Sequence, residues 1–404
     1  HRMGIVGVLI IAQIVLYGAG LIVLRDSTNF AAVEWLFLAL SVLSALWIVG
    51  AKTNPGYKIG WLVIVLGLMP LGPALGGNHL SQFNQRRLRS MERKIRKNLT
   101  AECGRAASLG ELMGENSARM AHYLEQTTHC PVYGNTRTKY YPLGDVCYDD
   151  ILKALRGAER YIFIEYFIIE EGKLWNSILD ILREKAQRGV EARVIYDDIG
   201  SITTLPSDYP AMLEMLGVHC RVFNRFVPVV SLRQNNRDHR KYMIIDGRVA
   251  FTGGINMADE YINVKPRFGH WKDSAIRLEG DAVWSMTVSF LAMWDFTNSD
   301  EEHFTPFRPA PAQGGAEGYV QPYHDCPWDK EPVGQTVYLN LIYRAQRYVY
   351  ITTPYLVIDY SLSMALTTAA KSGVDVRIIT PHIPDKKTVF ETTRSHYEEL
   401  LEAG

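Results

Sequence analysis

The sequence lacks the paired cysteines and the net charge that are typical of some protein classes. Its cysteines are odd in number and scattered, with no CxxC spacing among the five at positions 103, 130, 147, 220 and 326. This pattern argues against a disulfide framework or a cysteine zinc site and favours reduced thiols that face the cytosol. Net charge is also absent, because 43 Lys plus Arg balance 43 Asp plus Glu. Overall charge therefore argues neither for nor against a nucleic-acid partner.

Long apolar runs, in contrast, are concentrated at the N-terminus. Met3–Leu24 and Ala31–Gly50 are long enough to cross a bilayer, and Ile59–Gly77 follows them with prolines at 70 and 73. None of the three has the polar face expected of a helix on a soluble domain. We expect residues 3–77 to form two or three transmembrane helices, the third of which either spans the membrane or re-enters it.

A strongly basic run follows these segments. Arg86–Lys97 contains seven basic residues against the single acid Glu92. The positive-inside rule then predicts a multi-pass protein of the cell (inner) membrane whose later domains are cytoplasmic. Residues 78–137 are expected to form a basic juxtamembrane helix, which binds anionic lipid headgroups, and a connector.

From about residue 138 the pattern becomes α/β. Three apolar segments have the length and β-branched content of buried strands: Arg160–Ile169, Glu191–Tyr196 and Val218–Phe223. Three amphipathic segments between them predict helices: Asp150–Arg156, Leu174–Arg188 and Ala211–Leu216. Residues 138–305 are therefore expected to form a first α/β domain. Asp197 and Asp198 follow one of its strands, where a structural loop or hydroxyl-binding role is favoured over a role as metal ligands.

Part of this pattern occurs twice. AERY at Ala158–Tyr161 matches AQRY at Ala345–Tyr348 with an offset of 187 residues. GVEARVI at Gly189–Ile195 matches GVDVRII at Gly373–Ile379 with an offset of 184. The repeat predicts that residues 306–404 begin a second copy of the domain, and we expect this copy to be incomplete.

The densest polar motif is H-x-K-x-x-x-x-D, formed by His239, Lys241 and Asp246. In an extended strand His239 and Lys241 point to the same face, where an imidazole nucleophile and a cation suit attack on a phosphodiester. Asp246 has the opposite parity and lies in an Asp-Gly turn before the strand Val249–Thr252. The same offsets place a second His-x-Lys motif near positions 423–426, beyond the last residue of this chain.

Gly253, Gly254 and Asn256 complete the motif. The glycines would let the backbone approach an anion, and Asn256 would donate a further hydrogen bond to it. The whole string resembles the signature of the phospholipase D superfamily. Residues 138–404 also resemble bacterial cardiolipin synthases, in the segments Ile164–Ile168, Tyr196–Ser201, Phe251–Asn263, Gly269–Ser274, Thr352–Leu356 and Pro384–Lys387.

The resemblance implies a duplicated phospholipase D-type α/β domain with a mixed sheet flanked by helices. It also implies that His239 attacks phosphatidylglycerol to form a phosphatidyl-histidine, which a second phosphatidylglycerol converts to cardiolipin. Lys241 and Asn256 would hold the phosphoryl oxygens. The histidine of the second motif would protonate the leaving alcohol and later deprotonate the incoming one. The scheme requires neither a metal nor a cofactor.

Asp273 is the candidate for the carboxylate that orients the imidazole of His239. An ion pair with Lys272 or Arg277 is its alternative role. Because Asp246 lies an odd number of residues after His239, its side chain would point to the other face of the strand. We therefore assign it a supporting or turn role.

Other functions remain open at this stage. A membrane-bound phospholipase D would transfer the phosphatidyl group to water, and a related phosphatidyltransferase would use another lipid such as phosphatidylethanolamine. A nuclease and a nucleic-acid partner are disfavoured by the apolar N-terminus, and a catalytically dead membrane scaffold by the intact motif. Single-motif members of the superfamily pair their motifs across a dimer. A homodimer is therefore an alternative, which the long second half of this chain disfavours.

Overall fold

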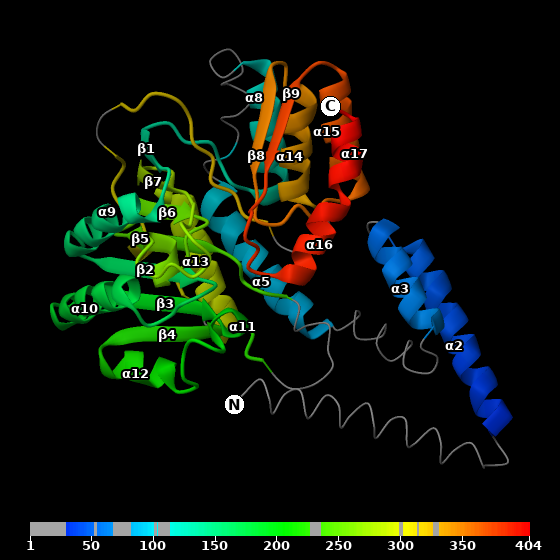
Figure 1. Cartoon of the computed structure of the whole chain (residues 1–404). Helices are drawn as coiled ribbons and strands as arrows, with labels where there is room; N and C mark the ends of the chain where they lie inside the picture. The colour runs from blue at the N-terminus through cyan, green and yellow to red at the C-terminus, as the bar shows by residue number, and fades with distance from the viewer. Residues whose placement is uncertain are drawn as a thin grey trace.

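The computed structural model describes residues 30–51, 55–67, 82–100, 103, 114–226, 236–298, 302–312, 315–325 and 331–404 (Figure 1). The first predicted membrane segment lies outside these residues. Helix α2 (Phe30–Gly50) occupies the second, and α3 (Pro55–Gly67) covers part of the third. These two helices lie side by side, apart from the α/β units. Within the described ranges, none of the helices combines the length and the hydropathy needed to span a bilayer.

The first α/β unit is built on a seven-stranded mixed sheet with the order β1-β7-β6-β5-β2-β3-β4. Its strands are β1 (Thr136–Tyr141), β2 (Tyr161–Tyr166), β3 (Glu191–Asp197), β4 (Val218–Phe223), β5 (Lys241–Ile245), β6 (Val249–Gly253) and β7 (Ala275–Gly280). Strands β2, β3 and β4 are parallel, and the remaining neighbours pair antiparallel. The three strands predicted before the motif are confirmed, and the expected mixed sheet flanked by helices is present.

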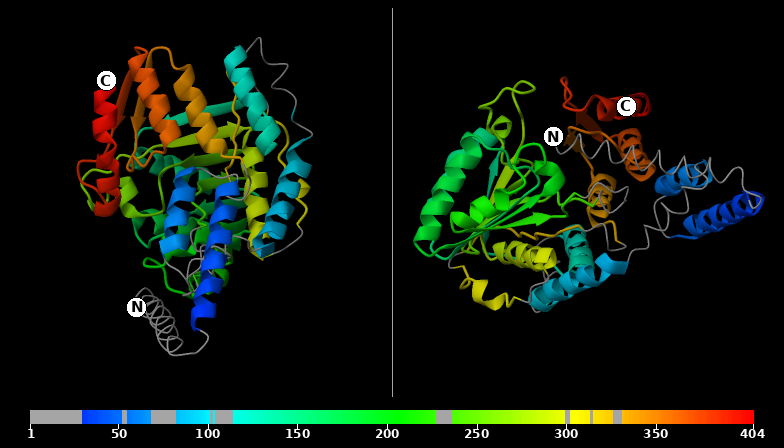
Figure 2. Two further views of the ribbon diagram at one scale, coloured as in Figure 1. Left: turned by 90° about the vertical axis from the view of Figure 1, so that its right-hand side faces the viewer. Right: turned by 90° about the horizontal axis from the view of Figure 1, so that it is seen from below.

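Helices cover both faces of this sheet (Figure 2). Helices α9 (Gly144–Arg156) and α10 (Lys173–Gln187) pack on one face, where they bury Leu155, Trp175 and Leu182. Helix α13 (Val283–Asn298) packs on the other face and is almost wholly buried. The shorter helices of this unit are α11 (Asp198–Ser201), α12 (Tyr209–Met215), η4 (Asp259–Ile262) and η5 (Thr305–Phe307).

The predicted basic helix is α5 (Gln82–Leu99), and it forms an outer layer on α13 (Figure 2). Met91, Ile95 and Leu99 recur every four residues and are buried against the α13 side of the core, which explains why this polar segment folds as a helix. The Lys94 ammonium also pairs with the buried Asp295 carboxylate of α13 at 2.5 Å. The basic helix is thus integrated into the first α/β unit. A second helix in the predicted connector, α8 (Glu115–Thr128), follows it.

The C-terminal unit repeats the β-α-β core of the first. Strands β8 (Tyr348–Thr352) and β9 (Asp375–Ile379) form a parallel pair flanked by α14 (Val333–Arg344), α15 (Tyr360–Lys371), α16 (Lys387–Ser395) and α17 (Tyr397–Glu402). The register of the two copies agrees with the sequence offsets. Tyr161 pairs with Glu191 in the first unit, and Tyr348 pairs with Asp375 in the second.

Segments on both sides of the predicted limits at residues 138 and 305 contact the first unit. Strand β1 begins at Thr136, within the segment assigned to the connector. Beyond residue 305, Phe307 packs on Phe163 in the first core, and Val320 forms a β-bridge with Tyr133. The first unit therefore includes residues on both sides of its predicted limits. The start of β1 completes an edge of its sheet, and Phe307 completes its core.

Candidate active site

The segment that precedes the motif is fixed by the end of β3. The fully buried Asp197 carboxylate accepts hydrogen bonds from the backbone N–H groups of Ile199, Gly200 and Asp238 and pairs with Arg237 at 3.2 Å. Asp198 accepts one from the backbone N–H of Phe226 at 2.7 Å. Both aspartates therefore serve as loop anchors, and Asp197 sets the position of the chain immediately before His239.

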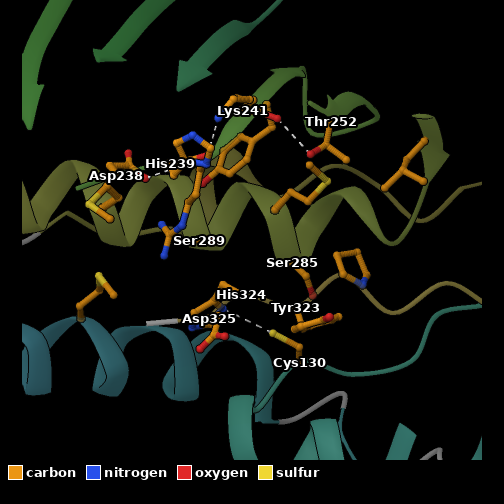
Figure 3. Close-up of a pocket in the computed structure, with 18 of the residues that line it drawn as sticks. Cys130, Asp238, His239, Lys241, Thr252, Ser285, Ser289, Tyr323, His324 and Asp325 are labelled. Carbon is orange, nitrogen blue, oxygen red and sulfur yellow. Dashed lines mark hydrogen bonds between the residues drawn. The ribbon is translucent and has the colours of Figure 1, made fainter. Parts of the chain in front are cut away.

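His239 lies just outside the sheet, because β5 begins at Lys241. The prediction that both residues belong to one extended strand was therefore wrong. The two side chains nonetheless line the same cavity of about 640 Å³, and Figure 3 shows them on one side of it. The contact that joins them is a hydrogen bond of 2.7 Å from Nζ of Lys241 to the backbone oxygen of His239.

The cavity has a polar end and an apolar wall. Asn236, Arg237, His239 and Lys241 form the polar end, at the start of β5. The wall comes mainly from α5, α13 and the neighbouring strands, and its apolar side chains are Met91, Phe223, Ile276, Leu278, Met286, Met293 and Phe296. Tyr323, His324 and Cys130 lie across the cavity from His239 (Figure 3), with the Cys130 thiol 3.8 Å from Nδ1 of His324.

His239 is a neutral imidazole at physiological pH. Its ring packs against that of Phe167, with centroids 4.8 Å apart, while part of the residue stays exposed. This partial burial and the cations of Lys241 and Lys386 lower its pKa from 6.5 to about 4, while the negative charge of Asp238 acts in the opposite direction. An imidazole that stays unprotonated is available as a nucleophile.

Lys241 remains a cation but holds its proton less tightly than an exposed lysine. Its side chain is buried, and this burial lowers its pKa from 10.5 to about 8. The negative charges of Asp238, Asp273 and Asp197 act in the opposite direction. The site therefore combines a neutral imidazole with an adjacent ammonium group, the pairing expected from the motif.

Asp246 lies at the far end of β5 and is not among the residues that line the cavity. Its backbone is left-handed, with φ of 54°, in the turn to β6. Its two carboxylate oxygens accept hydrogen bonds of 2.8–2.9 Å from the backbone N–H groups of Glu159, Arg160 and Tyr161. This geometry gives Asp246 the turn role that its parity indicated, joining the β5–β6 hairpin to the start of β2.

Asn256 is buried and engaged within the protein. Its Oδ1 accepts a hydrogen bond from the backbone N–H of Ile168 at 3.1 Å, and its Nδ2 donates one to the Tyr261 hydroxyl at 2.8 Å. The amide has one further N–H, so these contacts orient the group without using all its donors.

The two glycines allow close packing of β6 against β7. A Cβ at Gly253 would lie 2.3 Å from the Ser274 carbonyl oxygen, and one at Gly254 would lie 2.0 Å from the Asp273 carboxylate. The anion that approaches Gly254 is thus Asp273 of the protein itself. Its charge acts on Lys241. Among the described residues, His239 donates no hydrogen bond to Asp273, and neither Lys272 nor Arg277 forms an ion pair with it.

The sequence did not reveal a buried pair of carboxyl groups next to the motif. The pair consists of Glu165 of β2 and Asp238, which directly precedes His239. Burial, followed by the charge of Asp238, raises the pKa of Glu165 well above its usual value. A proton on Glu165 allows a hydrogen bond between the two groups, and Arg240 lies 3.4 Å from Glu165. The available signal was Glu165 itself, the single charge in the otherwise uncharged strand YIFIEY.

Comparison with known proteins identifies the family. The family model described as "Cardiolipin synthase, PLD-like domain" matches residues 151–265 and 338–404, which include the motif and both copies of the β-α-β core. A cardiolipin synthase of Geobacillus sp. is 32% identical over 380 residues, which cover 91% of this chain and 74% of the relative. The chain belongs to the cardiolipin synthase family.

The chain is also similar to other bacterial proteins. A cardiolipin synthase of Alkalihalophilus pseudofirmus is 36% identical over 288 residues, which cover 71% of this chain and 56% of the relative. An uncharacterized protein of Streptococcus mutans serotype c is 42% identical over 368 residues, which cover 89% of this chain and 79% of the relative. The chain thus spans only part of the length of the cardiolipin synthases that it matches.

Proposed function

We propose that the protein is a cardiolipin synthase that transfers a phosphatidyl group between two molecules of phosphatidylglycerol. A ring nitrogen of His239 attacks the phosphorus of the first, the P–O bond to glycerol breaks, and glycerol leaves with a proton. A hydroxyl oxygen of the second then attacks the phosphorus, the N–P bond breaks, and cardiolipin forms as that hydroxyl loses its proton. Lys241 stabilises the charge on the phosphoryl oxygens in both steps.

One observation carries this proposal: His239 and Lys241 line a cavity that is also lined by several apolar side chains. A phospholipid needs a cation and a nucleophile at its phosphate and an apolar surface along its acyl chains. The polar end of the cavity meets the first need. Met91, Met286 and Met293 favour a flexible chain on the wall, because methionine adapts to irregular apolar shapes.

The proton on the alcohol needs a second acid–base group. The sequence repeat supports a histidine from a second His-x-Lys motif for this role. A homodimer that brings two copies of His239 together is the alternative source. Asn256, with its remaining N–H, is proposed to act on a phosphoryl oxygen after a small movement of the chain near β6.

The proposed location is the cell membrane, with N-terminal helices in the bilayer and the α/β units on the cytoplasmic side. The exposed side of α5 supports this, because Arg93, Arg96 and Lys97 face away from α13. Anionic lipids, including phosphatidylglycerol, are the proposed partners of this surface, and nucleic acid is not.

Product analysis in phosphatidylglycerol vesicles tests the proposal. We expect the protein to form cardiolipin and glycerol in equal amounts, and His239→Ala to reduce both to background because the nucleophile is lost. His122→Ala, a change of an exposed histidine on α8, is the matched control and should keep wild-type activity. Phosphatidic acid in place of cardiolipin would identify a hydrolytic phospholipase D instead. An exchange product only with added phosphatidylethanolamine would identify a different acceptor.

A further inference from the structure

Three polar side chains gather where β8 and β9 end. The Tyr355 hydroxyl donates a hydrogen bond to the Asp385 carboxylate, and Nζ of Lys386 donates one to the Tyr355 hydroxyl at 3.1 Å. Nζ of Lys386 also lies 4.9 Å from the centre of the Tyr355 ring and 3.9 Å from the Asp385 carboxylate. We call these three residues the C-terminal triad. Its contacts hold a lysine, which is normally flexible, in one place.

The charges of the C-terminal triad act on the active site of the first unit. After burial and Lys241, the cation of Lys386 is the next influence that lowers the pKa of His239. Burial raises the pKa of Tyr261 to about 12, and the charge of Asp385 adds to this effect. Tyr261 is the hydrogen-bond partner of Asn256. The charges of a cation and a carboxylate from the C-terminal unit therefore act on two different parts of the first unit.

The C-terminal triad is also accessible to a ligand. The Lys386 side chain is 61% exposed and that of Asp385 is 27% exposed. An ammonium has three donors, so Lys386 has hydrogen-bonding capacity beyond its bond to Tyr355. The position agrees with the general rule for parallel strands, whose carboxyl ends bind ligands. The triad also falls within two segments, Thr352–Leu356 and Pro384–Lys387, to which no function had been assigned.

We propose that Tyr355, Asp385 and Lys386 bind the headgroup of the acceptor lipid, an anionic phospholipid whose headgroup carries free hydroxyls. This inference rests on the proposed function. Lys386 binds a phosphate oxygen of the acceptor, and the Asp385 carboxylate accepts a hydrogen bond from a headgroup hydroxyl. Tyr355 positions both residues and makes no covalent contribution.

The charges favour the acceptor over the donor as the lipid that the triad binds. The donor phosphorus is attacked by His239, so its oxygens lie against Lys241, whose ammonium contacts the backbone of His239. Lys386 belongs to the other unit and influences His239 only through its charge. A second phosphate, with the hydroxyl that will attack, can therefore be held beside the first without competing for Lys241.

Separate measurement of the two half-reactions tests the triad. Phosphatidylglycerol, diluted to different mole fractions in phosphatidylcholine vesicles, is mixed with the protein. The first turnover of glycerol release and the steady-state formation of cardiolipin are then recorded. For Lys386→Gln we expect glycerol release in the first turnover at the wild-type rate. We expect the mole fraction for half-maximal cardiolipin formation to rise about tenfold, the effect of one lost charge-assisted hydrogen bond.

Lys387→Gln is the matched control, because it removes the same charge one residue further along the chain. It should behave as wild type. Tyr355→Phe should change the half-maximal mole fraction in the same direction as Lys386→Gln, but less. Identical behaviour of Lys386→Gln and Lys387→Gln, or equal slowing of both half-reactions by Lys386→Gln, would overturn the assignment. Failure of the wild type to form cardiolipin would instead overturn the proposed function, and this inference with it.

Discussion

At the scale of the residue, burial adjusts His239 and Lys241 to complementary charge states. Burial lowers the pKa of His239 to about 4, so the imidazole is neutral above that pH. Burial also lowers the pKa of Lys241 to about 8, so its ammonium loses its proton as the pH rises through that value. Between these two values a neutral nucleophile and a cation coexist, as phosphatidyl transfer to His239 requires.

This balance predicts the pH dependence of the first half-reaction. The rate of glycerol release should be level between about pH 5 and 7 and should fall to half near pH 8, because Lys241 loses its charge there. Lys241→Arg should be slower but should lack this alkaline decline, since a guanidinium stays protonated. Rapid-quench measurements across the pH range would check both curves. An alkaline decline that persists unchanged in Lys241→Arg would show that another group causes it.

The site residues could be predicted only where their chemistry is local. His239 and Lys241 are recognisable from their spacing, and both line the cavity. The pairing of Glu165 with Asp238 joins residues 73 positions apart in the chain. It depends on the register of β2 and β5, which no motif specifies. The position of Asp273 over Gly254 likewise depends on how closely β6 and β7 approach each other.

At the scale of the element, the strands with apolar residues on both faces were predicted well because burial dominates their sequence. Two of the elements that were not predicted, β1 and α13, were missed for opposite reasons. Strand β1 is a mostly exposed edge strand, TRTKYY, with no apolar alternation. Helix α13 is apolar on every side, because sheet and α5 enclose it, and so it has no amphipathic pattern to detect.

The hairpin β5–β6 carries the motif, and Asp246 ties it to the start of β2. Asp246→Ala should lower the free energy of unfolding by about 3 kcal/mol, because three backbone N–H groups lose a charged acceptor. Asp246→Asn should cost less, since asparagine tolerates the left-handed backbone and keeps one oxygen as acceptor. Denaturant unfolding would measure both changes. If Asp246 only supports the hairpin, Asp246→Asn should release glycerol at close to the wild-type rate per folded molecule. A large loss of that rate would indicate a catalytic role instead.

At the scale of the whole molecule, the duplication was predicted from short matches, and the register of β8 with β9 agrees with the offsets of those matches. The two copies differ in their surroundings. Strand β2 is buried throughout, because β3 and β5 flank it and helices cover both its faces, whereas β8 is alternately exposed. Sequence matches could identify the second copy. They could not reveal that the charge of Lys386 lowers the pKa of His239, because that effect depends on how the two units pack.

The central claim is that His239 forms a covalent bond to the phosphatidyl group. The most direct test is the mass of the intact protein after rapid mixing with phosphatidylglycerol and a quench that avoids acid. We predict a mass increase of one phosphatidyl group, which peptide mapping locates at His239 and which is absent from His239→Asn. Cardiolipin formation without any adduct, or with an adduct on another residue, would contradict the account.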